Sequence, residues 1–241
     1  MKRSILLALC LLLGLAVWSG AEENRYQQFN SDVDQAYAAY RKALFQTNKK
    51  DAEKSGKANE MFIKQWLSIK EAYSNKPPEV FSSDPEWADT LSSIEEIAQK
   101  SAGQIQDGQL AEAHETLEAI RDELSDLRKR NSVIVFSDHV NNYHEVMEGL
   151  LIAGYTPDKI NEDAVIEIRN RLAVLNYLAE EIQENVPDKY LDNETYKKLQ
   201  NSLLASLKGL AQTVETNDPK EISKSINMLK PAYAKLFVNF G

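Results

Sequence analysis

Apolar residues recur at three- and four-residue spacing along almost the whole chain, and the alternation typical of strands is nearly absent. That spacing places apolar side chains on one face of a helical turn, so it predicts an all-α fold. The first two helices are expected near residues 30–46 and 51–74, and the apolar run Val133–Phe136 is interpreted as a buried turn rather than a strand. The side chains expected inward on the second helix are Met61, Phe62, Trp66, Ile69 and Tyr73.

The later helices should begin at polar caps, because Ser, Thr, Asp and Asn side chains accept hydrogen bonds from the free amides of a first turn. Ser83-Asp84-Pro85-Glu86 combines a cap at Asp84, a proline in the first turn and a glutamate typical of a capping box. The other caps are expected at Ser137 or Asp138, Thr156, Asn193 and Asp218.

The helix pattern repeats when the chain is shifted by 109 positions. Pro78 then falls on Pro187, the cap Asp84 on Asn193, and Trp87 on Tyr196, with no gap from Pro78 to Arg128. The match includes apolar positions, caps and turns, which favours an internal duplication. The sequence therefore predicts a tandem duplication of a roughly four-helix unit, giving two antiparallel bundles and about eight helices. We expect the first unit at 24–131 and the second at 132–241.

The N-terminal residues 1–21 have the features of a signal peptide. Lys2 and Arg3 precede the apolar run Ile5–Val17, and small residues at Ser19 and Ala21 fit signal peptidase, which predicts cleavage after Ala21. The expected location is therefore outside the cytoplasm, in the periplasm of a bacterium. The alternatives are an uncleaved anchor and a lipoprotein attached through the chain's one cysteine, Cys10.

Cleavage would remove that cysteine, so the mature protein could form no disulfide and offer no thiolate ligand. The net charge of −9 argues against nucleic acid and anionic membrane surfaces as partners, but is compatible with a metal ion or a protein partner. No membrane segment is expected after cleavage.

Motifs that would indicate a reaction are missing from the sequence. It has no Gly-rich phosphate loop, no His-Glu-x-x-His helix and no Cys-x-x-Cys-His for covalent haem. We therefore expect binding rather than catalysis. In length, compartment and helix pattern the chain resembles the periplasmic four-helix-bundle cytochromes, but no haem-binding residue can be carried over from them.

The histidines and acids at the centre of the chain are the candidate metal ligands. His144 and Glu148 stand one helical turn apart, as do His114 and Glu118, and Asp122 follows one turn later. A histidine nitrogen and a carboxylate at this spacing can share one cation. If the two central helices form an antiparallel hairpin, the two rows face each other and could hold a divalent transition metal such as Cu or Zn.

The same residues also fit an ordinary structural role. His114, Glu118 and Asp122 lie one position past the apolar stripe of their helix, where charged side chains normally flank a solvated face. His144 and Glu148 flank Val140 and Met147 in the same way. The alternative hypothesis is therefore a helical protein–protein interaction module with no metal.

Overall fold

The computed structural model describes the backbone of residues 2–241 and the side chains of residues 23–241. All regular structure in this part of the chain is helical, which confirms the all-α prediction. The chain divides into two compact units, of which the first ends at Val133 and the second is Ile134–Gly241. The side chains of the predicted signal peptide, 1–21, lie outside the described residues. From residue 23 onward, no helix has the length and apolar character needed to cross a membrane.

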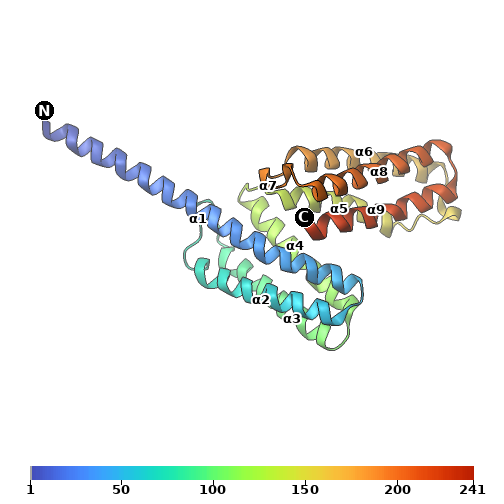
Figure 1. Cartoon of the computed structure of the whole chain (residues 1–241), viewed down its shortest axis with the longest axis horizontal. Coiled ribbons are helices and arrows are strands. Elements are labelled where there is room, and N and C mark those ends of the chain that lie inside the picture. The colour runs from blue at the N-terminus through green and yellow to red at the C-terminus, as the bar shows by residue number, and fades with distance from the viewer. Residues whose placement is uncertain (1) are drawn as a thin grey trace. The chain divides into compact units, whose positions relative to one another are not determined.

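The first unit is a bundle of four helices (Figure 1). Helix α2 packs against α1 and α3, and α4 packs against α3 and α1, so the helices form a closed ring around one core. The connections between α1 and α2, and between α3 and α4, are short, which makes these helices antiparallel neighbours. The elements are α1 (Lys2–Asn48), α2 (Ala52–Tyr73), the 3-10 turn η1 (Glu79–Phe81), α3 (Trp87–Gln106) and α4 (Leu110–Arg130).

The second unit has the same plan, as Figure 1 shows. Helix α6 packs against α5 and α8, and α9 packs against α8 and α5, which is again a closed ring of four. A short helical segment lies before the third long helix here, as η1 does in the first unit. The elements are α5 (Phe136–Ile152), η2 (Pro157–Lys159), α6 (Glu162–Glu184), α7 (Asp188–Leu191), α8 (Glu194–Thr216) and α9 (Pro219–Phe240).

Equivalent hydrogen bonds join the second and third long helices of each bundle. In the first unit the indole nitrogen of Trp87 donates to the carbonyl oxygen of Tyr73 at 3.0 Å. In the second unit the phenol of Tyr196 donates to the carbonyl oxygen of Ile182 at 3.4 Å. Both donor and acceptor positions differ by 109 residues between the units, which is the shift of the sequence repeat.

Each unit also contains a triad of packed aromatic rings. In the first triad the ring centroids lie 4.9–5.6 Å apart, and in the second all three separations are 6.2 Å. Rings at these distances bury large apolar surfaces and favour offset or edge contacts. The triads are Phe29, Phe81 and Trp87 in the first unit, and Phe136, Tyr190 and Tyr196 in the second.

The inward positions of α2 agree with the sequence pattern except at Met61. Phe62, Trp66 and Ile69 are buried, but Met61 is 56% exposed. Adjacent helical residues point about 100° apart, so only one of the two apolar neighbours can face the core. Phe62 takes that place because it shares a face with Trp66 and Ile69, and the inward assignment of Met61 is wrong.

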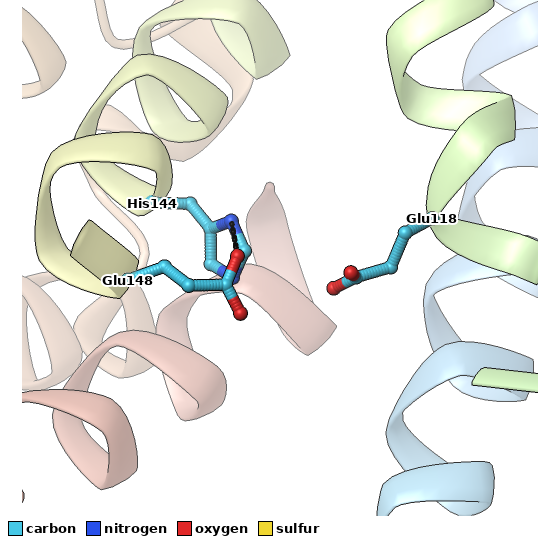
Figure 2. Close-up of side chains that lie close together, drawn as sticks. All are labelled: Glu118, His144 and Glu148. Atoms are coloured by element: carbon cyan, nitrogen blue, oxygen red, sulfur yellow. Dashed lines mark ion pairs between the residues drawn. The ribbon is translucent and has the colours of Figure 1, made fainter. Parts of the chain in front are cut away.

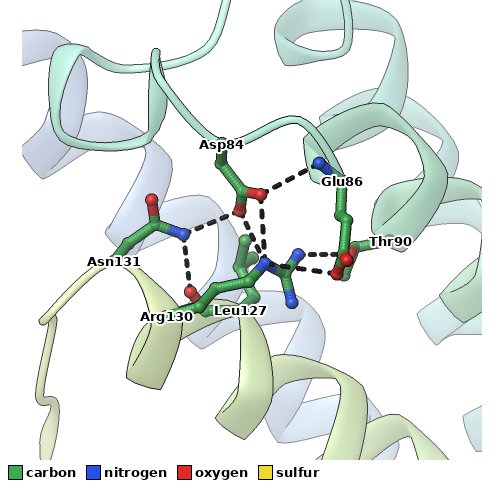
Figure 3. A network of polar contacts seen from close by, with 6 residues as sticks. All are labelled: Asp84, Glu86, Thr90, Leu127, Arg130 and Asn131. Carbon is green, nitrogen blue, oxygen red and sulfur yellow. Dashed lines mark hydrogen bonds and ion pairs between the residues drawn. The ribbon is translucent and has the colours of Figure 1, made fainter.

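The capping box predicted at Asp84 is also wrong. Helix α3 begins at Trp87, two residues later than expected, and has no side-chain cap. The Asp84 carboxylate instead accepts hydrogen bonds from the Glu86 amide at 3.0 Å, from Arg130 Nε at 2.9 Å and from Asn131 Nδ2 at 2.7 Å (Figure 3). Asp84 therefore ties the loop before α3 to the end of α4.

Helix α6 is capped by Asn161 and not by the predicted Thr156. The Asn161 side chain accepts a hydrogen bond from the amide of Ala164 at 2.9 Å. Thr156 precedes the separate turn η2 and makes no capping hydrogen bond with its side chain. Pro157, directly after Thr156, begins the 3-10 turn rather than the α-helix.

Two of the other predicted caps are confirmed. The Asn193 and Asp218 side chains accept hydrogen bonds from first-turn amides of α8 and α9. The start of α5 differs slightly, because its cap position is Val135 and not Ser137 or Asp138. Asp138 still contributes there, since its carboxylate accepts from the Val135 amide at 3.0 Å.

Candidate metal centre

His144 lies on the inner part of α5, where it is 7% exposed. Its neighbours Tyr143 and Met147 belong to the buried face of that helix. The imidazole packs against the ring of Tyr233 from α9, with the centroids 5.0 Å apart and the planes at 36°. The interpretation of His144 as a residue on a solvated face is therefore wrong, because Tyr233 of α9 covers one side of the imidazole.

Glu148 is one turn further along α5, and its side chain is 31% exposed. Figure 2 shows its carboxylate turned back toward the imidazole, and Oε2 lies 3.7 Å from His144 Nδ1. That separation is too long for a hydrogen bond. It is shorter than the sum of one metal–nitrogen and one metal–oxygen bond, about 4.2 Å for zinc. One cation can therefore touch both atoms.

Two tyrosine rings pack together beside His144. Tyr143 stacks on Tyr233 with ring centroids 5.9 Å apart and an interplanar angle of 11°. Burial raises the pKa of the Tyr143 phenol well above its usual value, so this group stays neutral over the physiological range.

His114 in the first unit has a different environment. Its Nδ1 lies 3.1 Å from the carbonyl oxygen of Leu44 and 2.9 Å from Thr47 Oγ1. The Thr47 hydroxyl itself donates to Leu44, so both neighbours accept and Nδ1 must carry the proton. Nδ1 therefore attaches α4 to the last turns of α1. Its Nε2 lies 3.7 Å from Glu118 Oε1.

The acids on α4 are less suited to a metal than the sequence suggested. Glu118 Oε1 lies 3.6 Å from the guanidinium of Arg121, a positive charge that competes with a bound cation. Asp122 is exposed on the same helix. Glu118 and Asp122 belong to the first unit, whereas His144 and Glu148 belong to the second. Glu118 is also labelled in Figure 2. The antiparallel hairpin of the two central helices stays a prediction.

One further histidine contact was not found from the sequence. His139 Nδ1 on α5 lies 3.6 Å from Glu181 Oε2 on α6. The Tyr177 phenol also donates to Glu181, and this hydrogen bond raises the pKa of Tyr177. The residues are 42 positions apart along the chain, so no local spacing could have indicated the pair.

Comparison of the chain with protein-family models, with curated proteins and with solved structures finds no match. A functional assignment therefore depends on the chemistry and geometry of these side chains.

Proposed function

We propose that this protein is an exported helical-bundle binding protein that holds a divalent transition metal ion through His144 and Glu148. The observation that carries the proposal is the 3.7 Å separation between His144 Nδ1 and Glu148 Oε2. Both side chains extend from one rigid helix, so the pair is preorganised and needs little rearrangement to bind. Water molecules would complete the coordination of the ion.

The donor atoms indicate which metals fit. Imidazole nitrogen suits Zn, Cu and Ni, and a carboxylate is accepted by all of them. After the proposed cleavage at Ala21 the chain has no thiolate, so selection by sulfur is excluded for the mature form. The expected order is Cu(II) before Zn(II), and both before Mn(II). Binding rather than catalysis is proposed, because no catalytic motif accompanies the pair.

We also propose that the two units are copies of one ancestral bundle. The equivalent hydrogen bonds of Trp87 and Tyr196 support this, as do the two aromatic triads. For the first helix of each unit the matching shift is 107, which places buried Val33 on buried Val140. His144 and Glu148 then correspond to Tyr37 and Arg41.

Tyr37 and Arg41 form a cation–π contact, with the guanidinium 5.7 Å from the ring centroid. An arginine cannot lose its proton in a protein and so cannot bind a cation. The corresponding place in the first unit is therefore chemically closed to metal. The proposed site belongs to the second unit alone, and the first unit serves as a comparison within the same molecule.

Thermal unfolding of the full chain with and without Zn(II) tests the metal proposal. A ligand that binds the folded state raises the melting temperature. We expect a rise for the wild type, and its loss in Glu148→Gln, which keeps the shape of the side chain but removes the charge. A second variant, His144→Ala, should also lose it. Ser223→Ala on α9 is the control and should keep the full rise. No rise in the wild type, or an equal rise in both site variants, would rule out the site.

A separate variant examines the sequence prediction that α4 supplies further ligands. Glu118→Gln should lower the affinity for Zn(II), measured by isothermal titration calorimetry, if the carboxylate of α4 takes part. An unchanged affinity would leave His144 and Glu148 as the complete protein site and would remove α4 from the proposal.

A protein-interaction module is the second candidate function. The observation that favours it is a row of exposed apolar side chains on α6, and the same molecule could have both functions. This surface is independent of the metal pair, because none of its apolar residues is a proposed ligand.

A further inference from the structure

The outer face of α6 carries three large, exposed apolar side chains. Ile166 is 56% exposed, Val174 45% and Tyr177 59%. At 100° per residue these three side chains fall within about 80° of one another, exposed Ala173 lies at the edge of this sector, and exposed Asn170 is the polar residue inside it. The opposite face carries Ile168, Leu172, Leu175 and Ile182, which are buried in the core of the second unit. We call the exposed row the α6 stripe.

A hollow continues the α6 stripe at the N-terminal end of the helix. Its volume is about 450 Å³, and Ile166 belongs to both the hollow and the stripe. The turn between α8 and α9 forms the other wall, where Asn217 adopts the left-handed conformation with φ 53°. Four of the eight lining residues are apolar and four are polar or charged. The lining residues are Ile160, Asn161, Glu162, Val165, Ile166, Arg169, Asn217 and Pro219.

Both ends of the α6 stripe are acidic. Glu162 and Asp163 are exposed before Ile166, and Glu180 and Glu184 are exposed after Tyr177. Of the two arginines on α6, Arg171 is paired with Glu167 at 3.0 Å and Arg169 lines the hollow. The stripe therefore presents an apolar centre between two negative patches.

This charge pattern disfavours a second copy of the same face as the occupant. Two α6 stripes could meet in parallel or antiparallel orientation, and each arrangement places an acidic end against an acidic end. Like charges brought together in a contact cost energy and disfavour that partner. A partner with positive charge at both ends of an apolar row forms favourable charge pairs with the acidic residues at the same positions.

We propose that the α6 stripe docks an amphipathic helical segment of a partner protein, with apolar side chains in its centre and Lys or Arg at both ends. The apolar centre from Ile166 to Tyr177 is about 16 Å long, and the acidic ends, Asp163 and Glu180, lie about 25 Å apart. A helix of about 18 residues spans that distance. The burial of apolar side chains supplies the affinity, and the paired charges select the partner and its position.

The test uses a synthetic probe of known composition. It is an 18-residue helical peptide with Leu at positions i, i+3, i+4 and i+7 and Lys at both ends, labelled for fluorescence anisotropy. The matched peptide has Glu in place of every Lys. With the full chain, the Lys peptide should bind saturably and at least tenfold more tightly than the Glu peptide. Added salt should reduce this preference, because exposed charges are screened.

Variants of the chain locate the binding surface. Ile166→Ser and Val174→Ser should each weaken binding of the Lys peptide at least tenfold. Met228→Ser is the matched control, because Met228 is 57% exposed on α9 and lies outside the stripe. It should leave binding unchanged. Exposed side chains tolerate such changes, so the melting temperature should stay the same in all three variants. The combined change Glu180→Lys and Glu184→Lys should shift the preference toward the Glu peptide.

Several results would overturn the proposal. Equal binding of the Lys and Glu peptides would remove the charge pattern as the basis of recognition. An effect of Ile166→Ser no larger than that of Met228→Ser would remove the stripe. A dimer in analytical ultracentrifugation that Tyr177→Ser dissociates would assign the face to a second copy. Binding to phosphatidylcholine vesicles that Val174→Ser abolishes would assign it to a lipid surface.

Discussion

The indole nitrogen of Trp87 donates a hydrogen bond of 3.0 Å to the carbonyl oxygen of Tyr73. Tyr73 is the last residue of α2, so its carbonyl has no acceptor role within that helix. The buried indole also stacks on Phe81 with the centroids 4.9 Å apart. One side chain therefore fixes the end of α2 to the beginning of α3.

Replacing Trp87 with Ala should lower the free energy of unfolding by about 3–5 kcal/mol, because the change leaves a cavity in the core. Urea denaturation monitored by circular dichroism measures it. Met61→Ala is the control, since Met61 is exposed and should change the stability by no more than about 0.5 kcal/mol. A cost below about 1 kcal/mol for Trp87→Ala would contradict the burial of the ring.

The hydrogen bonds around Asp84 predict a pH-dependent stability. Burial by itself would raise the pKa of this carboxyl, but hydrogen bonds from Asn131, the Glu86 amide and Arg130 outweigh it and hold the pKa below the usual value of 3.8. A carboxyl with a lowered pKa in the folded state stabilises the protein above its unfolded pKa. That contribution is lost as the pH falls below about 3.8 toward the folded pKa.

Asp84→Asn should therefore destabilise the protein most at neutral pH, by about 2–3 kcal/mol, since it removes charge-assisted hydrogen bonds. The difference from the wild type should stay constant between about pH 5 and 7 and should shrink below about pH 4. Urea denaturation at a series of pH values measures it. A difference that grows as the pH falls would contradict the sign of the shift.

The cap of α6 can be identified by a pair of substitutions. Asn161→Ala should lower the free energy of unfolding by about 1 kcal/mol, because an amide of the first turn loses its acceptor. Thr156→Ala should have a much smaller effect, since Thr156 does not cap with its side chain. Thermal or urea unfolding measures both losses of stability. A larger loss for Thr156→Ala than for Asn161→Ala would indicate that Thr156 caps the helix.

Metal binding at His144 and Glu148 should weaken in acid. The ion needs a neutral imidazole and an ionised carboxylate, so protons compete with it. Free imidazole side chains take up a proton near pH 6.5, and the affinity for Zn(II) should therefore fall steeply between about pH 7.5 and 5.5. Calorimetric titrations at several pH values measure this. An affinity independent of pH in that interval would argue against an imidazole ligand.

The N-terminus of the exported protein should be Glu22. The basic residues Lys2 and Arg3, the apolar run and the small side chains before the proposed cut all fit signal peptidase. Mass spectrometry of the chain recovered from the exported fraction measures the mass directly. A mass that includes Met1–Ala21 would indicate an anchor instead, and an Ala21→Tyr variant should block the cleavage.

The sequence by itself determined the helices, most of their inward faces and two of their caps. These features are local: the period of the apolar residues sets the buried face, and Asn193 and Asp218 cap amides only two or three residues away. The spacing of His144 and Glu148 is local in the same sense, since one helical turn fixes it.

Only the tertiary structure decided the partners that are distant in the chain. Asp84 meets Arg130, 46 residues later, and this contact takes it away from the cap position. His114 bonds Leu44 across 70 residues, which occupies one of its two nitrogens. Tyr233 on α9 covers His144, so its ring is buried rather than solvated. Helical periodicity predicts which face of a helix points inward. The packing of the helices decides which side chains from other helices that face contacts.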